Sequence, residues 1–226
     1  MAKLKPIPAN QALLRLMQGN KRFIKKRKTG GAIEHKDQDW LREKPRGPFA
    51  IILSCSDSRA PAEILFDQGL GELFVIRVAG NIVAPSQVGS VEFAAATTQA
   101  QLVIVMGHTE CGAIRATLDS LDGKASVPTE NIQAIVGRIR PHVEGLFTSK
   151  KNAQKRDALW RESVRANVLA STDHLRHGSR FLEELVREKK LAIVGAEYCL
   201  ETGVVDFFDN PFITKKKNNK KKGKKK

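Results

Sequence analysis

Residues 49–61 read FAIILSCSDSRAP, an apolar run that gives way at once to polar and charged residues. The run FAIIL has the length of a strand and is apolar at every position, which is typical of a parallel strand covered on both faces. Three further runs have the same character: LFVIRV at 73–78, LVIVMG at 102–107 and LAIVGAEY at 191–198. Segments of helical pattern separate them, so the sequence predicts an α/β fold with a mainly parallel central β-sheet flanked by helices.

The remaining pattern predicts one domain with two extensions. Helices are expected within 61–69 and at 89–100, 113–121, about 129–146 and 153–188, the last with breaks. Before the first strand, apolar residues in 9–28 recur at the spacing of an amphipathic helix that would pack on the core or on a second subunit. We therefore divide the chain into an N-terminal helical arm and linker at 1–48, an α/β domain at 49–213 and a disordered lysine-rich tail at 214–226.

The formal net charge of +15 is concentrated at the C-terminus, where KKKNNKKKGKKK contains nine lysines. This tail has no aromatic residue for base stacking, so we expect no nucleic-acid ligand beyond nonspecific contacts through it. No apolar run is long enough to cross a bilayer, and the first residues lack the apolar segment of a signal peptide. With only three cysteines, these features predict a cytoplasmic protein with reduced thiols and no membrane contact.

Cysteine and histidine residues follow two of the predicted strands. Cys55 comes just after the strand at 49–53, and GHTECG places His108 and Cys111 just after the strand at 102–107. Because ligands gather at the carboxyl ends of parallel strands, we expect these side chains to meet. Each alone would more often be a core residue, but together two thiols and one imidazole suit tetrahedral zinc. Three protein ligands leave the open position of a catalytic site, whereas Cys199 has no histidine nearby and is assigned a structural role.

Asp57 and Arg59 continue the pattern after Cys55 at alternate positions, so an extended backbone would point all three side chains the same way. Asp57 would then either bind zinc as a fourth ligand, or pair with Arg59 and accept a hydrogen bond from zinc-bound water. The two arrangements exclude each other, and the sequence leaves both open. Two thiolate ligands should make a zinc-bound water less acidic than neutral imidazoles do, so activity should rise with pH into the mildly alkaline range.

Together these motifs resemble a known family. CSDSRAP, EILFDQGLGELFVIRVAGNIV and MGHTECGA, with NQALLRLMQGNKRF in the arm, strongly resemble the β-class carbonic anhydrases over roughly residues 10–210. The resemblance implies a carbonate dehydratase, a zinc lyase that reversibly hydrates carbon dioxide to bicarbonate and a proton by a zinc-bound hydroxide. It implies one Zn²⁺ per chain held by Cys55, His108 and Cys111, with Asp57 paired to Arg59 as gate and hydrogen-bond acceptor.

The resemblance also assigns substrate contacts and partners. The backbone amide of Gly112 would lie near the substrate, and Phe74 and Phe93 match pocket positions, the second often a tyrosine. The protein is expected to be a homodimer or homotetramer, with its arm wrapped on a neighbouring subunit.

Two positions depart from the family pattern. Arg46 stands nine residues before Cys55, where many members have a glutamine that contacts substrate across the dimer. Ile52 replaces the tryptophan of a noncatalytic bicarbonate site, although Tyr198 matches the tyrosine of that site. We therefore expect this regulatory site to be missing.

Other functions share some of these features. Hydrolysis of carbonyl sulfide or carbon disulfide would use the same fold and metal, and the sequence does not separate it from carbon dioxide hydration. The basic ends also fit a nucleic-acid-binding protein with structural zinc, but three ligands beside an acid–arginine pair favour catalysis. A redox role is less favoured still because the chain has no C-x-x-C motif.

Overall fold

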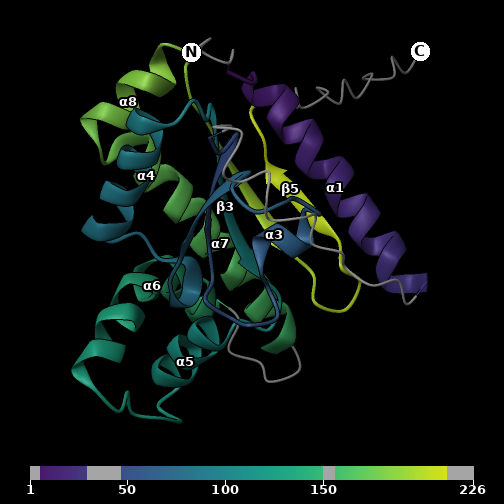
Figure 1. Ribbon diagram of the computed structural model, residues 1–226. Coiled ribbons are helices and arrows are strands. Elements are labelled where there is room, and N and C mark those ends of the chain that lie inside the picture. Colours follow the sequence, from purple (N-terminus) through teal and green to yellow (C-terminus); the bar gives the residue numbers. More distant parts are fainter. Residues whose placement is uncertain (1–5, 30–46, 150–155, 213–226) are drawn as a thin grey trace, which may run out of the picture.

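The computed structural model describes residues 6–29, 47–149 and 156–212, and within them it forms a five-stranded sheet (Figure 1). The strand order is β2-β1-β3-β4-β5. Four strands run parallel, namely β1 (Ala50–Ser54), β2 (Leu73–Arg77), β3 (Leu102–His108) and β4 (Ala192–Tyr198). The edge strand β5 (Val205–Asp209) pairs antiparallel with β4. The predicted mainly parallel sheet is confirmed.

The strand β5 was not predicted from the sequence. In its sequence VDFFD the exposed Asp206 stands between the buried Val205 and Phe207, and no other strand of the described residues pairs with its outer edge. Such a half-covered edge strand lacks the continuous apolar run by which the other four were recognised.

Helices and one 3₁₀ turn connect the strands. They are α1 (Ala9–Thr29), α3 (Ala62–Leu65), η1 (Ala79–Asn81), α4 (Pro85–Thr97), α5 (Gly112–Leu121), α6 (Glu130–Ser149), α7 (Arg156–His177) and α8 (Arg180–Arg187). The helix expected at 89–100 begins four residues earlier because Pro85 occupies its first turn. The segment expected at 153–188 is two helices, since Ser179 accepts a hydrogen bond from the Leu182 amide and starts α8.

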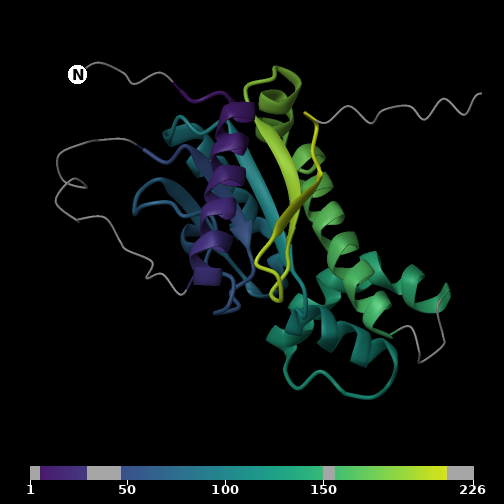
Figure 2. The same cartoon turned by 90° about the vertical axis from the view of Figure 1, so that its right-hand side faces the viewer.

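Successive residues of each central strand face two separate apolar layers. Ile52 and Ile104 pack in the layer covered by α1 and α3, whereas Ile51 and Val103 pack in the layer covered by α4, α7 and α8. Figure 2 shows α1 and α7 on opposite sides of the sheet. A third apolar cluster, formed by α5, α6 and α7, closes the carboxyl edge and contains Cys55 and Cys111.

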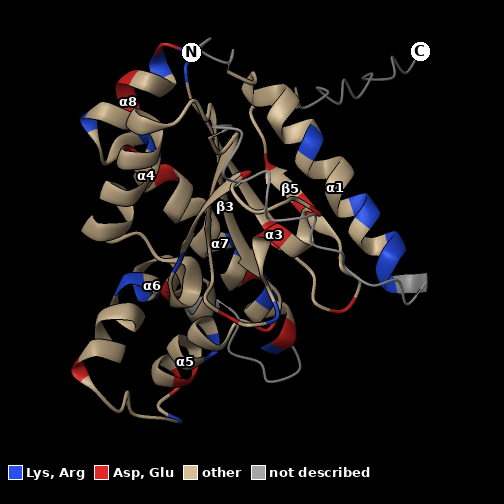
Figure 3. Ribbon diagram, in the orientation of Figure 1, with Lys and Arg blue, Asp and Glu red and all other residues tan. Residues whose placement is uncertain are grey.

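The helix α1 confirms the amphipathic helix predicted over 9–28 and packs on this chain's own sheet. Asn20 fixes it by donating to the Leu65 and Gly203 carbonyls at 3.1 and 2.9 Å and by accepting from the Val205 amide at 3.0 Å. Figure 3 shows several basic residues along α1, whose sequence contains no acidic residue. Two of them, Arg22 and Lys26, form ion pairs with Asp67.

Several expectations lie outside the described residues. These are most of the linker, including Arg46, and the lysine-rich tail. In the described part of the chain, no helix is both long and apolar enough to cross a membrane.

Candidate metal centre

The candidate metal centre lies at the carboxyl ends of two neighbouring strands. β1 and β3 are parallel, with Ser54 opposite Met106. Cys55 follows the last residue of β1, His108 is itself the last residue of β3 rather than just past it, and Cys111 directly precedes α5. The predicted meeting of these three side chains is confirmed: their ligand atoms all lie within 4.8 Å of one another, and all three residues are buried.

The donor atoms of this cluster fit a metal ion. His108 Nδ1 lies 2.8 Å from the Thr109 carbonyl oxygen, which places the ring proton on Nδ1 and leaves the Nε2 lone pair for a ligand. Nε2 is buried and has no hydrogen-bond partner among the described residues, and an unpaired buried polar atom is costly. A metal ion bound at Nε2 would remove this cost.

The backbone also supports the Cys55 sulfur. Gly80 donates its amide to Cys55 Sγ at 3.3 Å. Gly80 has a φ of +71°, a conformation that favours glycine, and an added Cβ would lie 2.9 Å from the Ile139 side chain. The motif RVAGN between the two predicted ligand segments therefore has a structural role at the metal centre.

Electrostatics at the two thiols favour a thiolate. A hydrogen bond with Cys111, helped by His108 and by backbone amides, outweighs burial and lowers the pKa of Cys55 to about 4. The same contact and burial hold the pKa of Cys111 above its usual range. The shifts of the two thiols therefore run in opposite directions, with the thiolate favoured on Cys55. A divalent cation would favour loss of a thiol proton, because metals bind the thiolate form.

Asp57 and Arg59 form the pair that the sequence offered as one of two alternatives. Arg59 donates from Nε to Oδ1 at 3.0 Å, from Nη2 to Oδ2 at 2.8 Å and from its backbone amide to Oδ1 at 2.9 Å. These hydrogen bonds hold the pKa of Asp57 well below its usual range. Asp57 Oδ2 is 3.9 Å from His108 Nε2, so the carboxylate lies beside the candidate ligands.

The expected extended backbone at this pair is wrong. Residues 58–59 form a turn, closed by a 3.0 Å hydrogen bond from the Ala60 amide to the Asp57 carbonyl. Asp57 also accepts from the amide two residues ahead, a local arrangement that favours a turn over an extended strand. The turn, rather than alternation along a strand, brings the two side chains together.

Arg77 is a site residue that was not singled out from the sequence. It is the last residue of β2, opposite Ser54. Its Nε donates to the Cys55 carbonyl at 3.0 Å and its Nη2 to the Asp57 carbonyl at 2.6 Å. The signal that could have revealed it is a charged residue at the end of an otherwise apolar strand, LFVIR.

A family model described as carbonic anhydrase matches residues 50–205. The chain belongs to the carbonic anhydrase family. A carbonic anhydrase of Mycolicibacterium smegmatis is 34% identical over 210 residues, which cover 91% of this chain and 95% of that protein. Carbonic anhydrase 2 of Mycobacterium tuberculosis is 32% identical over 205 residues, with coverages of 90% and 93%.

Solved structures confirm the fold class. The β-carbonic anhydrase CafA of Aspergillus fumigatus matches with a TM-score of 0.66 at 22% identity, over 76% of this chain and 79% of that one. A Coccomyxa β-carbonic anhydrase matches with a TM-score of 0.65 at 22% identity, with coverages of 85% and 84%. The resemblance to β-class carbonic anhydrases stated from the motifs is confirmed.

Of the residues expected to contact substrate, Gly112 lies next to the metal-ligand cluster, whereas Phe74 and Phe93 lie farther away. Gly112 is the first residue of α5, next to Cys111, and no described atom lies within 4 Å of where its Cβ would be. Phe74 lies opposite Ile51, so it is roughly 10 Å along the sheet from the carboxyl end at ~3.3 Å per residue. Its ring lies 6.3 Å from that of Phe93, which is 60% exposed.

The two residues compared above with a noncatalytic bicarbonate site of the family both lie in the core. Ile52 and Tyr198 are both buried in the apolar layer under α1. Burial also raises the pKa of Tyr198. The third thiol, Cys199, lies outside the Cys55–His108–Cys111 cluster, as expected.

Proposed function

We propose that this chain is a zinc-dependent carbonate dehydratase that interconverts carbon dioxide with bicarbonate and a proton. The observation that carries the proposal is the buried cluster of Cys55, His108 and Cys111, in which the lone pair of His108 has no described partner. Two sulfurs and one imidazole nitrogen suit Zn²⁺, and three protein ligands are typical of catalytic zinc. Membership of the carbonic anhydrase family supports the reaction.

A zinc ion held by these residues would supply a Lewis acid that lowers the pKa of water. Asp57 stays ionised next to the ligands, since Arg59 holds its pKa low, so it can only accept hydrogen bonds. It would orient a group that still carries a proton. While the Asp57 carboxylate accepts these hydrogen bonds from Arg59, it would be kept from the metal, and this is how the pair would act as a gate.

The first turn of α5 would favour the anionic product. Gly112 begins this ten-residue helix, and the first amides of a helix have no intrahelical acceptor. Together with the helix dipole they attract negative charge. Because no described atom fills the space beside Gly112, a substrate oxygen could approach its amide closely.

We also propose that the protein acts as a homodimer or homotetramer. Phe74 and Phe93 contact each other at the β2 edge of the sheet, and the exposed Phe93 ring would be covered by a second subunit. Since Phe74 is remote from its own metal centre along the strand, a role in a substrate pocket would require a second copy. A chain from a structure described as one of two tetrameric β-carbonic anhydrases of Sordaria macrospora shares the fold, with a TM-score of 0.63 at 20% identity.

Stopped-flow carbon dioxide hydration by the zinc-loaded chain tests the proposal, at neutral pH and near pH ~8.5, which is above the ~7 at which water on an imidazole-bound zinc ionises. Cys55→Ser should abolish turnover and zinc retention. Cys199→Ser is the matched control and should keep both, since Cys199 lies outside the cluster. Zinc-loaded protein that is inactive at both pH values would refute carbon dioxide hydration, and turnover of carbonyl sulfide by that sample would identify the alternative substrate.

A further inference from the structure

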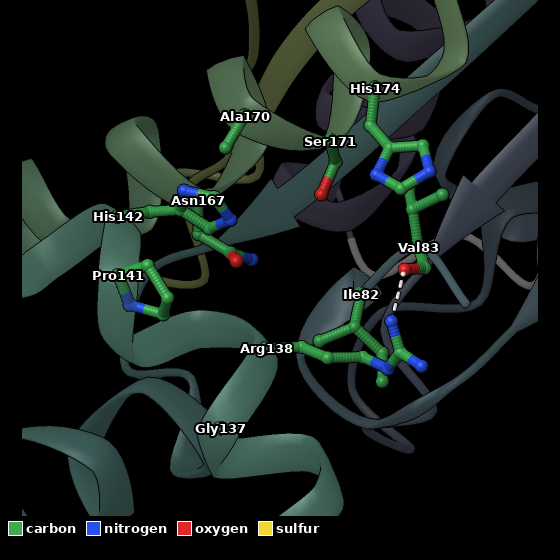
Figure 4. A pocket seen from close by; sticks show the side chains of 10 residues that line it. All are labelled: Ile82, Val83, Gly137, Arg138, Pro141, His142, Asn167, Ala170, Ser171 and His174. Carbon is green, nitrogen blue, oxygen red and sulfur yellow. Dashed lines mark hydrogen bonds between the residues drawn. The ribbon is translucent and has the colours of Figure 1, made fainter. Parts of the chain in front are cut away.

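A pocket of about 260 Å³ lies between α6, α7 and the segment that follows η1. Figure 4 shows it from close by, with Arg138 and His142 on α6 and Asn167, Ser171 and His174 on α7. The pocket is separate from the metal centre, because none of the three candidate ligands lines it. It is near the lower limit of small-molecule sites, ~300 Å³, and therefore suits a small ligand.

The rim of the pocket carries one guanidinium, which is always charged, and two imidazoles, and all three side chains can donate hydrogen bonds. These are Arg138, His142 and His174, and no acidic residue is among the described residues that line the pocket. Arg138 uses one of its five N–H donors on the Val83 carbonyl, at 3.3 Å. Burial, and then the neighbouring His174, lowers the pKa of His142.

The floor of the pocket is polar, buried and held in place. Asn167 and Ser171 are only 2% and 5% exposed. Asn167 Nδ2 donates to the Gly80 carbonyl at 2.7 Å, and Ser171 Oγ donates to the Asn81 carbonyl at 3.1 Å. These bonds fix the side chains. Asn167 keeps a second Nδ2 proton that can donate to a ligand, whereas its amide oxygen and the Ser171 hydroxyl oxygen can only accept. The polar floor disfavours an apolar occupant, and the positive charge of Arg138 disfavours a cation.

We propose that this pocket binds a small oxyanion, a phosphate or carboxylate group held between Arg138 and the imidazoles of His142 and His174. A guanidinium matches the planar arrangement of two oxygens in either group, and an N–H group of each imidazole can donate a further hydrogen bond to an oxyanion. Two hydrogen bonds through Gly80 link the pocket to the metal centre: the Gly80 carbonyl accepts from Asn167, and the Gly80 amide donates to Cys55 Sγ.

The test is a titration of the zinc-loaded full chain with inorganic phosphate and, separately, with acetate, each balanced against sodium chloride at constant ionic strength. Imidazole NMR signals of the five histidines are followed, with His142→Gln and His174→Gln providing the assignments. We expect saturable shifts of the His142 and His174 signals with a dissociation constant of about 1 mM or lower for at least one anion. Phosphate and acetate then distinguish a phosphoryl from a carboxylate ligand.

Matched variants on α6 separate a site from general charge. Arg138→Met should weaken binding about tenfold or more, because it removes a charged donor. Arg140→Met should not, since Arg140 does not line the pocket and pairs with Glu144 on the same helix. Shifts that chloride reproduces, equal losses in the two variants, or shifts confined to His108 would each overturn the proposal. None of these readouts depends on turnover. The anion-binding proposal can therefore be refuted while carbon dioxide hydration is confirmed, and carbon dioxide hydration can be refuted while anion binding is confirmed.

Discussion

Replacing Gly107 by alanine inserts a methyl group between β3 and α7, one residue before His108. The added Cβ would lie 2.7 Å from Val168 Cγ2 and 3.0 Å from Val164 Cγ1, and real Cβ contacts essentially never fall below 3.0 Å. Both valines are buried on α7. Because β-branched side chains on a helix have one strongly preferred rotamer, neither can turn aside, and the strand and helix must separate.

The cost of Gly107→Ala follows from this clash. Overpacking of a core typically costs about 1–3 kcal/mol. Val168→Ala alone should also destabilise, by about 2 kcal/mol, since it removes two buried methyl groups. In the double variant the new methyl group enters the space that Val168 leaves. The combined loss should therefore be smaller than the sum of the single losses by at least about 1 kcal/mol.

Urea denaturation of zinc-loaded protein at a fixed free zinc concentration measures these differences, and zinc content after dialysis reports on His108. We expect Gly107→Ala to lower both stability and zinc retention, and the double variant to recover part of both. Gly89→Ala is the control: it lies on α4 with no described atom within 4 Å of its Cβ, and it should stabilise by about 1 kcal/mol. Strictly additive losses, or unchanged zinc retention in Gly107→Ala, would refute the reasoning.

Three further predictions concern the groups around the candidate metal. Arg59→Met removes a half-exposed bidentate pair worth about 1–2 kcal/mol. The equilibrium of the Asp57 carboxylate should therefore shift roughly 5- to 30-fold toward binding the metal, and hydration should slow while zinc is retained. Unchanged turnover would contradict the gate. Arg77→Met removes two hydrogen bonds to the carbonyls of Cys55 and Asp57 and should lower both kcat and urea stability, whereas a loss of stability at full kcat would limit Arg77 to folding. Burial lowers the pKa of His108, but contacts with the Cys55 thiolate outweigh it and raise the pKa overall, which stabilises the protonated ring at low pH. Zinc must displace that proton, so zinc affinity measured by competition with a chelator should rise between pH ~6 and ~8, and a flat profile would exclude His108 as a ligand.

The sequence by itself determined the four parallel strands of the sheet and the meeting of the candidate ligands. Continuous apolar runs such as FAIIL are read directly as strands covered on both faces, and the carboxyl ends of parallel strands share one edge. Cys55 and His108 therefore had to converge, although 52 residues lie between them. No side-chain geometry was needed for this inference, because the position of a residue along its strand fixes the edge at which it emerges.

Only the tertiary structure shows how Asp57 and Arg59 come together. An extended segment and a turn are both open to SCSDSR, and the hydrogen bonds around Arg59, together with the clamp of Arg77 on the Cys55 and Asp57 carbonyls, select the turn. The oxyanion pocket likewise brings Arg138 to Asn167 and His174 on another helix. Such contacts depend on how the helices pack at the edge of the sheet. This packing is set by many residues that are distant in the sequence, so a local sequence pattern does not predict it.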